Sequence, residues 1–286
     1  MGVVALSLPV VGSAVTLRND VSEAQSIAYA NQSQFASVGQ INGASGVLIS
    51  EQWVLTAWHV VNNATAGNIN FRVNGVNRAV SEIHLLAAQN ANIQNVIVDG
   101  TDLALVKLTD SVLDVAAANL YTGNSEVGNT VSVIGFGNYG TGTGGATGGT
   151  GGVKRGMRNT LDFYTVNLGG GSIGGSLDRT GSMLSDFDDN TAGTNVTGSS
   201  SWLDLEGNVA GGDSGGAMFI ESNGQYLLAG INSFTAGPGN YGSLSGFTSV
   251  SWNQQWISST TAVPEPGTML VLAGLGAVAA RRRLKK

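Results

Sequence analysis

The chain has 286 residues, 43 of them glycine, and only 11% are charged, against roughly a quarter in most soluble domains. Its hydrophobic content of 42% is enough to build a core, which excludes an intrinsically disordered protein. A net charge of −6 argues against a nucleic-acid partner, and the absence of cysteine excludes disulfides, thiol catalysis and thiolate metal sites.

The first 20 residues have the apolar character of a signal-like leader. The run "MGVVALSLPVVGSAV" has signal-peptide length and ends in small residues, although no lysine or arginine precedes Arg18. We favour a leader over residues 1–20, and a first β-strand is the alternative.

Most of the remaining chain alternates short runs of Val, Ile, Leu and Thr with clusters of Gly, Asn and Ser. This punctuation is typical of many short strands joined by turns. Long stretches with helical periodicity are missing until the end, so we expect an all-β fold.

Histidine is the most common catalytic base, and the chain has two histidines. In "SGVLISEQWVLTAWHVV", two apolar runs flank a short turn, so a hairpin delivers His59 at the end of a buried strand. His84, in "SEIHLLAAQN", has no catalytic neighbour in the sequence, and we expect a structural role for it.

A carboxylate is needed to orient such a histidine. Asp102 lies in "GTDLALVKL", directly before an apolar run, where burial of an acid is costly unless hydrogen bonds compensate. Asp110 and Asp114 follow in a more polar stretch and are interpreted as surface residues.

Two later stretches could be mistaken for ligand sites. The Gly/Thr tract at 137–152 lacks the G-K-[ST] of a phosphate cradle and is expected to be a flexible loop. The acids in "SDFDDN", 185–190, could bind calcium, but the Gly and closing Glu of an EF-hand loop are missing. We favour a solvated loop there, and expect no metal and no cofactor.

The stretch "AGGDSGGAMF" surrounds Ser214 with glycines, which leave bare backbone N–H groups beside a candidate nucleophile. The chain order is His59, Asp102, Ser214. An α/β-hydrolase needs a histidine after the serine, and none occurs there. The subtilisin order and a zinc hydrolase also fail, for lack of a suitable earlier acid and of ligands.

Near the end, "WNQQWISST" predicts a short helix with Trp252 and Trp256 on one face. It is followed by Pro-Glu-Pro, an uncharged run at 267–280 and three arginines. As a helix the run would span about 21 Å, short of the ~30 Å hydrocarbon core. Arginines past an apolar span place the body on the far side of a membrane.

Three motifs, "LTAWHVV", "DLALVKL" and "GGDSGG", resemble the signatures of trypsin-like (chymotrypsin-fold) serine peptidases, in that family's order. Trp58, Val60 and Ala217 depart from the usual Ala, Cys and Pro, and none of these is a catalytic group. The resemblance implies two six-stranded antiparallel β-barrels with a short C-terminal helix. We place the domain at 21–260, its barrels at about 34–120 and 121–258.

The same resemblance implies roles for individual residues. Ser214 would attack a peptide carbonyl, His59 would take its proton and Asp102 would stabilise the imidazolium. The backbone N–H groups of Gly212 and Ser214 would form the oxyanion hole. Asn208, Ser233, Phe234 and Thr235 would line the specificity pocket, and the Asn and Thr favour small or medium uncharged side chains. Its partners would be protein or peptide substrates.

The last residues, 261–286, resemble the PEP-CTERM sorting tail of Gram-negative bacteria. This implies an exosortase-type partner, transient anchoring in the inner membrane by a hydrophobic sorting helix, and an exported, surface or matrix location. A plain membrane anchor is the alternative. The competing function is a non-catalytic surface adhesion or matrix protein built on a peptidase fold.

Overall fold

The computed structural model describes residues 15–169, 172–189, 191, 193–197 and 202–262. The first part of the expected leader and the sorting tail at 263–286 lie outside the described residues. The chain divides into a body, residues 1–254, and a C-terminal segment, residues 255–286. The expected C-terminal helix is present as α4 (Gln254–Thr261), and Trp252 precedes it.

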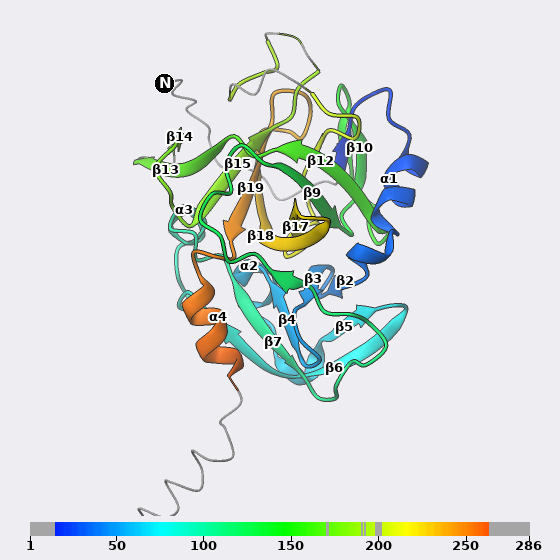
Figure 1. The fold of residues 1–286 in the computed structure, drawn as a ribbon, viewed down its shortest axis with the longest axis vertical. Coiled ribbons are helices and arrows are strands. Elements are labelled where there is room, and N and C mark those ends of the chain that lie inside the picture. Colours follow the sequence, from blue (N-terminus) through cyan, green and yellow to red (C-terminus); the bar gives the residue numbers. More distant parts are fainter. Residues whose placement is uncertain (1–14, 170–171, 190, 192, 198–201, 263–286) are drawn as a thin grey trace, which may run out of the picture. The chain divides into compact units, whose positions relative to one another are not determined.

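Six antiparallel strands close the first barrel in the order β2-β3-β4-β7-β6-β5 (Figure 1). They are β2 (Val38–Ile41), β3 (Ala44–Leu48), β4 (Trp53–Thr56), β5 (Asn70–Val73), β6 (Val76–Leu85) and β7 (Ala104–Leu108). Asn42-Gly43 and Asn74-Gly75 form two of its hairpin turns with positive φ at both residues, which suits the twist of the paired strands.

A second sheet of nine strands follows the path β12-β9-β17-β18-β19-β15-β13-β14, with β8 paired to β18. Its strands are β8 (Asn119–Leu120), β9 (Thr130–Gly135), β12 (Arg155–Thr160), β13 (Phe163–Gly169), β14 (Ser172–Ser176), β15 (Ser182–Asp186), β17 (Ala217–Ser222), β18 (Gln225–Ala236) and β19 (Leu244–Ser249).

This sheet differs from the expected closed barrel of six strands. Its ladder is open between β12 and β13, which pair with β9 and β15 respectively. Only Leu161 and Asp162 separate β12 from β13 along the chain. The two strands are therefore connected by this short link and not by paired backbone hydrogen bonds. The all-β class expected from the sequence is confirmed.

A small third sheet contains β1 (Val15–Leu17), β10 (Tyr139–Thr141), β11 (Gly145–Thr147) and β16 (Gly207–Asn208). Val15 and Leu17 belong to the hydrophobic core of the second sheet. Residues 15–20, which the sequence grouped with the leader, therefore lie in the folded body. The Gly/Thr tract also differs from the expected loop, because β10 and β11 pair within it.

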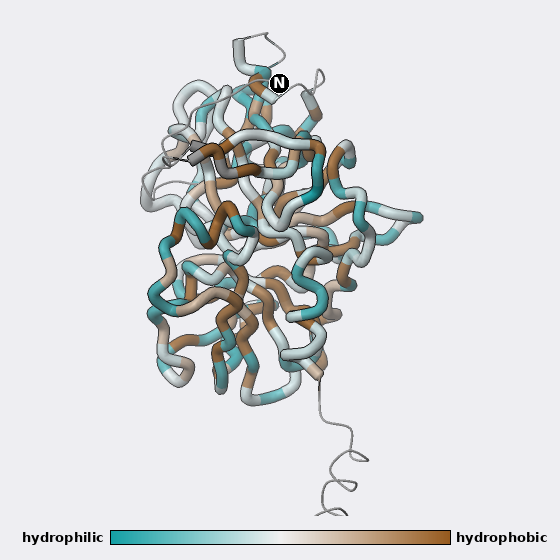
Figure 2. The backbone as a smooth tube through the Cα atoms, turned by 90° about the vertical axis from the view of Figure 1, so that its left-hand side faces the viewer, coloured by the Kyte–Doolittle hydropathy of each residue, from teal (hydrophilic) through white to brown (hydrophobic). Residues whose placement is uncertain are grey.

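Short helices decorate the strands: α1 (Glu23–Ala30), α2 (Trp58–Val61), α3 (Ile93–Val98), and the 3-10 turns η1 (Ser33–Phe35) and η2 (Ala66–Asn68). Ser22 and Gln25 form a capping box at the start of α1. The helix lies against β12, where Gly156 leaves room for Tyr29 and the Ser26 hydroxyl donates to the Gly156 carbonyl. In Figure 2 hydrophobic and hydrophilic stretches alternate along the chain at short intervals, as expected for short strands and turns.

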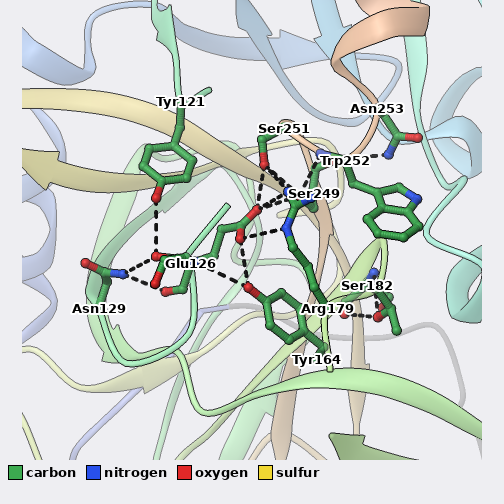
Figure 3. A network of polar contacts seen from close by, with 12 residues as sticks. Tyr121, Glu126, Asn129, Tyr164, Arg179, Ser182, Ser249, Ser251, Trp252 and Asn253 are labelled. Carbon is green, nitrogen blue, oxygen red and sulfur yellow. Dashed lines mark hydrogen bonds and ion pairs between the residues drawn. The ribbon is translucent and has the colours of Figure 1, made fainter. Parts of the chain in front are cut away.

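A buried carboxylate ties the second sheet together (Figure 3). Glu126 accepts hydrogen bonds from Tyr164, Arg179, Ser249 and Ser251, which belong to separate segments. Burial alone would raise the pKa of Glu126, but Arg179 and the hydroxyl donors lower it to about 2. The network joins the segment before β9 to the chain that follows β19.

Candidate active site

The first barrel places His59 in α2, the short helix that directly follows β4. Ala57 has extended backbone geometry and starts α2, so the chain turns sharply just before His59. The His59 backbone N–H donates to Asp102 Oδ1 at 3.0 Å, and its Nδ1 lies 2.8 Å from Asp102 Oδ2. The imidazole and its main chain are thus bound to the same carboxylate, while 28% of the side chain stays exposed.

Asp102 reaches His59 because their strands are neighbours. Thr56 at the end of β4 pairs with Ala104 at the start of β7. The Asp102 side chain is fully buried and also accepts a hydrogen bond from Ser233 Oγ at 2.5 Å. A donor from β18 of the second sheet therefore helps to satisfy a carboxylate of the first barrel.

The two side chains shift each other's pKa. Burial disfavours both charged forms, which would raise the pKa of Asp102 and lower that of His59. Their mutual attraction and hydrogen bonding outweigh burial, so the pKa of Asp102 is lowered and that of His59 is raised. The site favours a carboxylate beside an imidazole that readily accepts a proton.

Ser214 lies in the loop before β17. It lines the same cavity as His59, and this cavity has a volume of about 720 Å³. Two tight turns shape this loop: the Asp213 N–H donates to the Ala210 carbonyl, and the Gly216 N–H donates to the Asp213 carbonyl. Within the described part of the chain, no hydrogen bond joins His59 to Ser214. Such bonds are often loose without substrate.

The glycines beside Ser214 have identifiable functions. Gly212 has φ of +95° and Gly215 has φ of +79°, a region that favours glycine. A Cβ on Gly215 would lie 2.2 Å from the Ser45 carbonyl oxygen. Among the described residues, no acceptor binds the N–H groups of Gly212 and Ser214. Both expected oxyanion donors are therefore available.

The buried side chain of Asp213 stabilises the loop around Ser214. Its carboxylate accepts hydrogen bonds from the N–H groups of Gly137 and Ala210 at 2.8 and 3.1 Å. Burial raises the pKa of Asp213 to about 7, against the lowering effect of these donors and of Arg155. A carboxyl group at the centre of the loop thus ties Ser214 to the segment after β9.

Ser45 on β3 was not identified from the sequence. Its N–H donates to the Ser214 carbonyl and its Oγ to the Gly212 carbonyl, while Oγ accepts from the Phe136 N–H. It therefore ties the Ser214 loop to the first barrel. The only signal in the sequence is a small polar residue in an apolar strand, which is too common to identify it.

The expected pocket residues occupy different places. Ser233, Phe234 and Thr235 line the cavity with Ser214, but Asn208 is fully buried and lies behind it. Asn208 Nδ2 donates to Thr235 Oγ1 at 2.8 Å, and its Oδ1 accepts from Ser245 Oγ at 2.9 Å. Three uncharged side chains joined by hydrogen bonds therefore lie at this end of the cavity.

The remaining candidates lie apart from this cavity. His84 on β6 bonds to Glu82 at 2.9 Å, and Asp114 bonds to Arg78. Asp186 and Asp188 are buried, unlike the solvated loop expected from "SDFDDN".

No group of three metal-ligating side chains is found in the residues that the structure describes. In that same part of the chain, no helix is long and apolar enough to cross a membrane.

Comparisons with known proteins bear on the family and the fold of the chain. Residues 22–157 match the trypsin family model, and residues 262–285 match the PEP-CTERM protein-sorting motif. The trypsin match ends before Ser214. No curated protein matches the sequence.

Among solved structures, 1285 chains match. One is neuropsin, a serine protease expressed in the limbic system of mouse brain, with a TM-score of 0.58 and 16% identity. The match covers 86% of this chain and 99% of the neuropsin chain. At this identity, the likeness shows a shared fold and no more.

Proposed function

We propose that this chain, a trypsin-like protein with a PEP-CTERM sorting tail, is an exported serine endopeptidase that uses Ser214, His59 and Asp102. One observation carries the proposal. The ring of His59 is bound to a fully buried carboxylate at the edge of a cavity that Ser214 also lines. A base oriented in this way beside a serine is the arrangement that nucleophilic catalysis requires.

In the first half of the reaction, Ser214 Oγ attacks the carbonyl carbon of a peptide bond while His59 Nε2 takes the hydroxyl proton. The resulting oxyanion accepts hydrogen bonds from the free N–H groups of Gly212 and Ser214. Asp102 stabilises the imidazolium through the Nδ1 bond. His59 then gives its proton to the leaving amine, and an acyl-enzyme remains on Ser214.

In the second half, a water molecule attacks the acyl carbon and His59 takes its proton. Collapse of this second tetrahedral intermediate breaks the bond to Ser214, and His59 returns the proton to the serine oxygen. The products are a free carboxylate and a free amine, and the protein is regenerated. Every proton passes through one imidazole, so its contact with Asp102 affects both halves.

Asn208, hydrogen-bonded to both Thr235 and Ser245, bears on the choice of substrate side chain. These three side chains carry no charge, and Thr235 belongs to the lining of the cavity. We therefore propose that the peptidase cleaves after small or medium uncharged residues. Preferential cleavage after Lys or Arg in a peptide library would contradict this specificity.

The PEP-CTERM motif indicates export and sorting in Gram-negative bacteria and recognition by an exosortase. We propose that the hydrophobic tail anchors the protein transiently in the inner membrane, and that the folded body reaches the cell surface or matrix. Substrates would then be proteins or peptides outside the cytoplasm.

The proposal is tested by incubating the purified body with a mixed peptide library and identifying the products by mass spectrometry. The native protein should cleave, and Ser214→Ala should lose turnover while its thermal melting curve stays unchanged. Equal cleavage by both proteins would refute the role of Ser214. No cleavage by either would favour a non-catalytic surface or matrix protein on the same fold.

A further inference from the structure

Two cavities meet at His59. The first, of about 720 Å³, also contains Ser214, and the second, of about 430 Å³, lies over α2 and η2. Asn62 and Asn63, which follow α2, line both. These two amide side chains therefore share one cavity with Ser214 and both cavities with His59.

Among the residues that the structure describes, none that line these two cavities carries a charged side chain, apart from His59 when it is protonated. Primary amides are prominent instead. Six of them come from the segment after α2 and from the stretch that contains α3: Asn62, Asn63, Asn68, Gln89, Asn90 and Gln94.

These six amide groups have no hydrogen-bond partner among the described residues, in contrast to two other amides of the cavities. Asn42 donates its side-chain N–H to the Val60 carbonyl, and Asn232 donates to the Asp213 carbonyl. Asn42 and Asn232 therefore hold the fold, whereas the six amides are available to a ligand. Most are exposed at the surface.

A primary amide offers two donors and one acceptor, so it matches peptide groups and the side chains of Asn, Gln, Ser and Thr. It offers no counter-charge. A Lys or Glu placed in these cavities would lose part of its hydration without gaining an ion pair, which is unfavourable.

We infer that the peptidase selects polypeptide segments built from neutral hydrogen-bonding residues beside the scissile bond, and discriminates against charged ones of either sign. This inference rests on the proposed function. It concerns the residues that flank the one cleaved, and it assigns their recognition to the six free amides around His59.

The first experiment compares matched peptides with the same residue at the cleavage position and Gln, Glu or Lys at the neighbouring positions. Gln and Glu differ by little except charge. The Gln peptide should exceed both charged peptides in kcat/KM by about tenfold, the scale of one unpaired, partly desolvated charge. Equal rates, or a preference for either charged peptide, would overturn the inference.

The second experiment places a charge among the amides. Asn63→Asp and Gln94→Glu each supply the missing counter-charge and should raise kcat/KM for the Lys peptide relative to the Glu peptide. The gain should shrink as salt is raised, because the Debye length is only ~10 Å at 0.1 M. Gln225→Glu, at the exposed first residue of β18, is the matched control and should leave the ratio unchanged.

Labelling with a fluorophosphonate separates the two possible failures. If Ser214 is labelled and all peptides are cleaved alike, the substrate inference is wrong and the proposed function stands. If Ser214 is not labelled and no peptide is cleaved, the proposed function fails, and the inference fails with it.

Discussion

The two halves of the candidate site are held in different ways. In the first barrel, side chains make the site: His59 in α2 follows β4, Asp102 precedes the paired strand β7, and the two bond directly. In the second sheet the main chain makes it: the loop around Ser214 is shaped by turns, by two glycines with positive φ and by Asp213. The first half is therefore sensitive to side-chain chemistry, and the second to backbone geometry.

The largest expected effect comes from breaking the side-chain half. Asp102→Asn retains the size of the residue but removes the charge that stabilises the His59 imidazolium. We expect kcat to fall by about 10⁴. Steady-state kinetics on a cleaved peptide would measure it. A fall of less than about tenfold would mean that His59 does not depend on Asp102.

Gly215→Ala breaks the backbone half. The new Cβ would be forced against the Ser45 carbonyl and Thr56 Oγ1, at a φ that disfavours alanine. We expect a loss of at least about 2 kcal/mol in the free energy of unfolding, together with reduced activity. Urea denaturation would measure the first. Gly224→Ala, at an open turn that also has positive φ, is the control for the conformational part.

Ser45→Ala tests the connection between the halves. It removes the hydroxyl bonds to the Gly212 carbonyl and the Phe136 N–H but leaves the backbone bond to Ser214. We expect kcat to fall by about tenfold, because the two lost hydrogen bonds both hold the Ser214 loop against the first barrel, with KM less affected. Unchanged kcat would show that the Ser214 loop holds its geometry without this hydroxyl.

The smallest expected effect is a displacement of the pH profile. The raised pKa of His59 should move the acid limb of kcat/KM above about 6.5, the usual histidine value. The free energy of unfolding depends on the same two residues. The stabilisation from His59 is fully present below the usual histidine pKa and is lost as the pH rises through the raised pKa of the folded state. The stabilisation from Asp102 is lost as the pH falls through its lowered pKa. In Asp102→Asn the acid limb should move to lower pH.

The sequence led to His59, Asp102 and Ser214 because each lies in a local motif whose chemistry is recognisable. It could not lead to Ser45, whose importance depends on a loop about 170 positions away reaching β3. The helices α1 and α3 were missed because eight and six residues are too few for a clear helical period.

The sheets show the same limit. The Gly/Thr tract has the composition of a loop, yet β10 pairs with β1, which comes from the far end of the chain. The family resemblance predicts Asn208 in the specificity pocket, but hydrogen bonds to Thr235 and Ser245 hold it behind the cavity lining. Local sequence predicts the strands and turns, whereas these partners are set by the tertiary fold.

The most direct test of cooperation between the two halves is the intact mass of the protein after reaction with a fluorophosphonate. The native protein should gain one adduct on Ser214, Ser214→Ala should gain none, and His59→Ala should react far more slowly. An adduct on Ser214→Ala, or an equal rate for His59→Ala, would contradict the account.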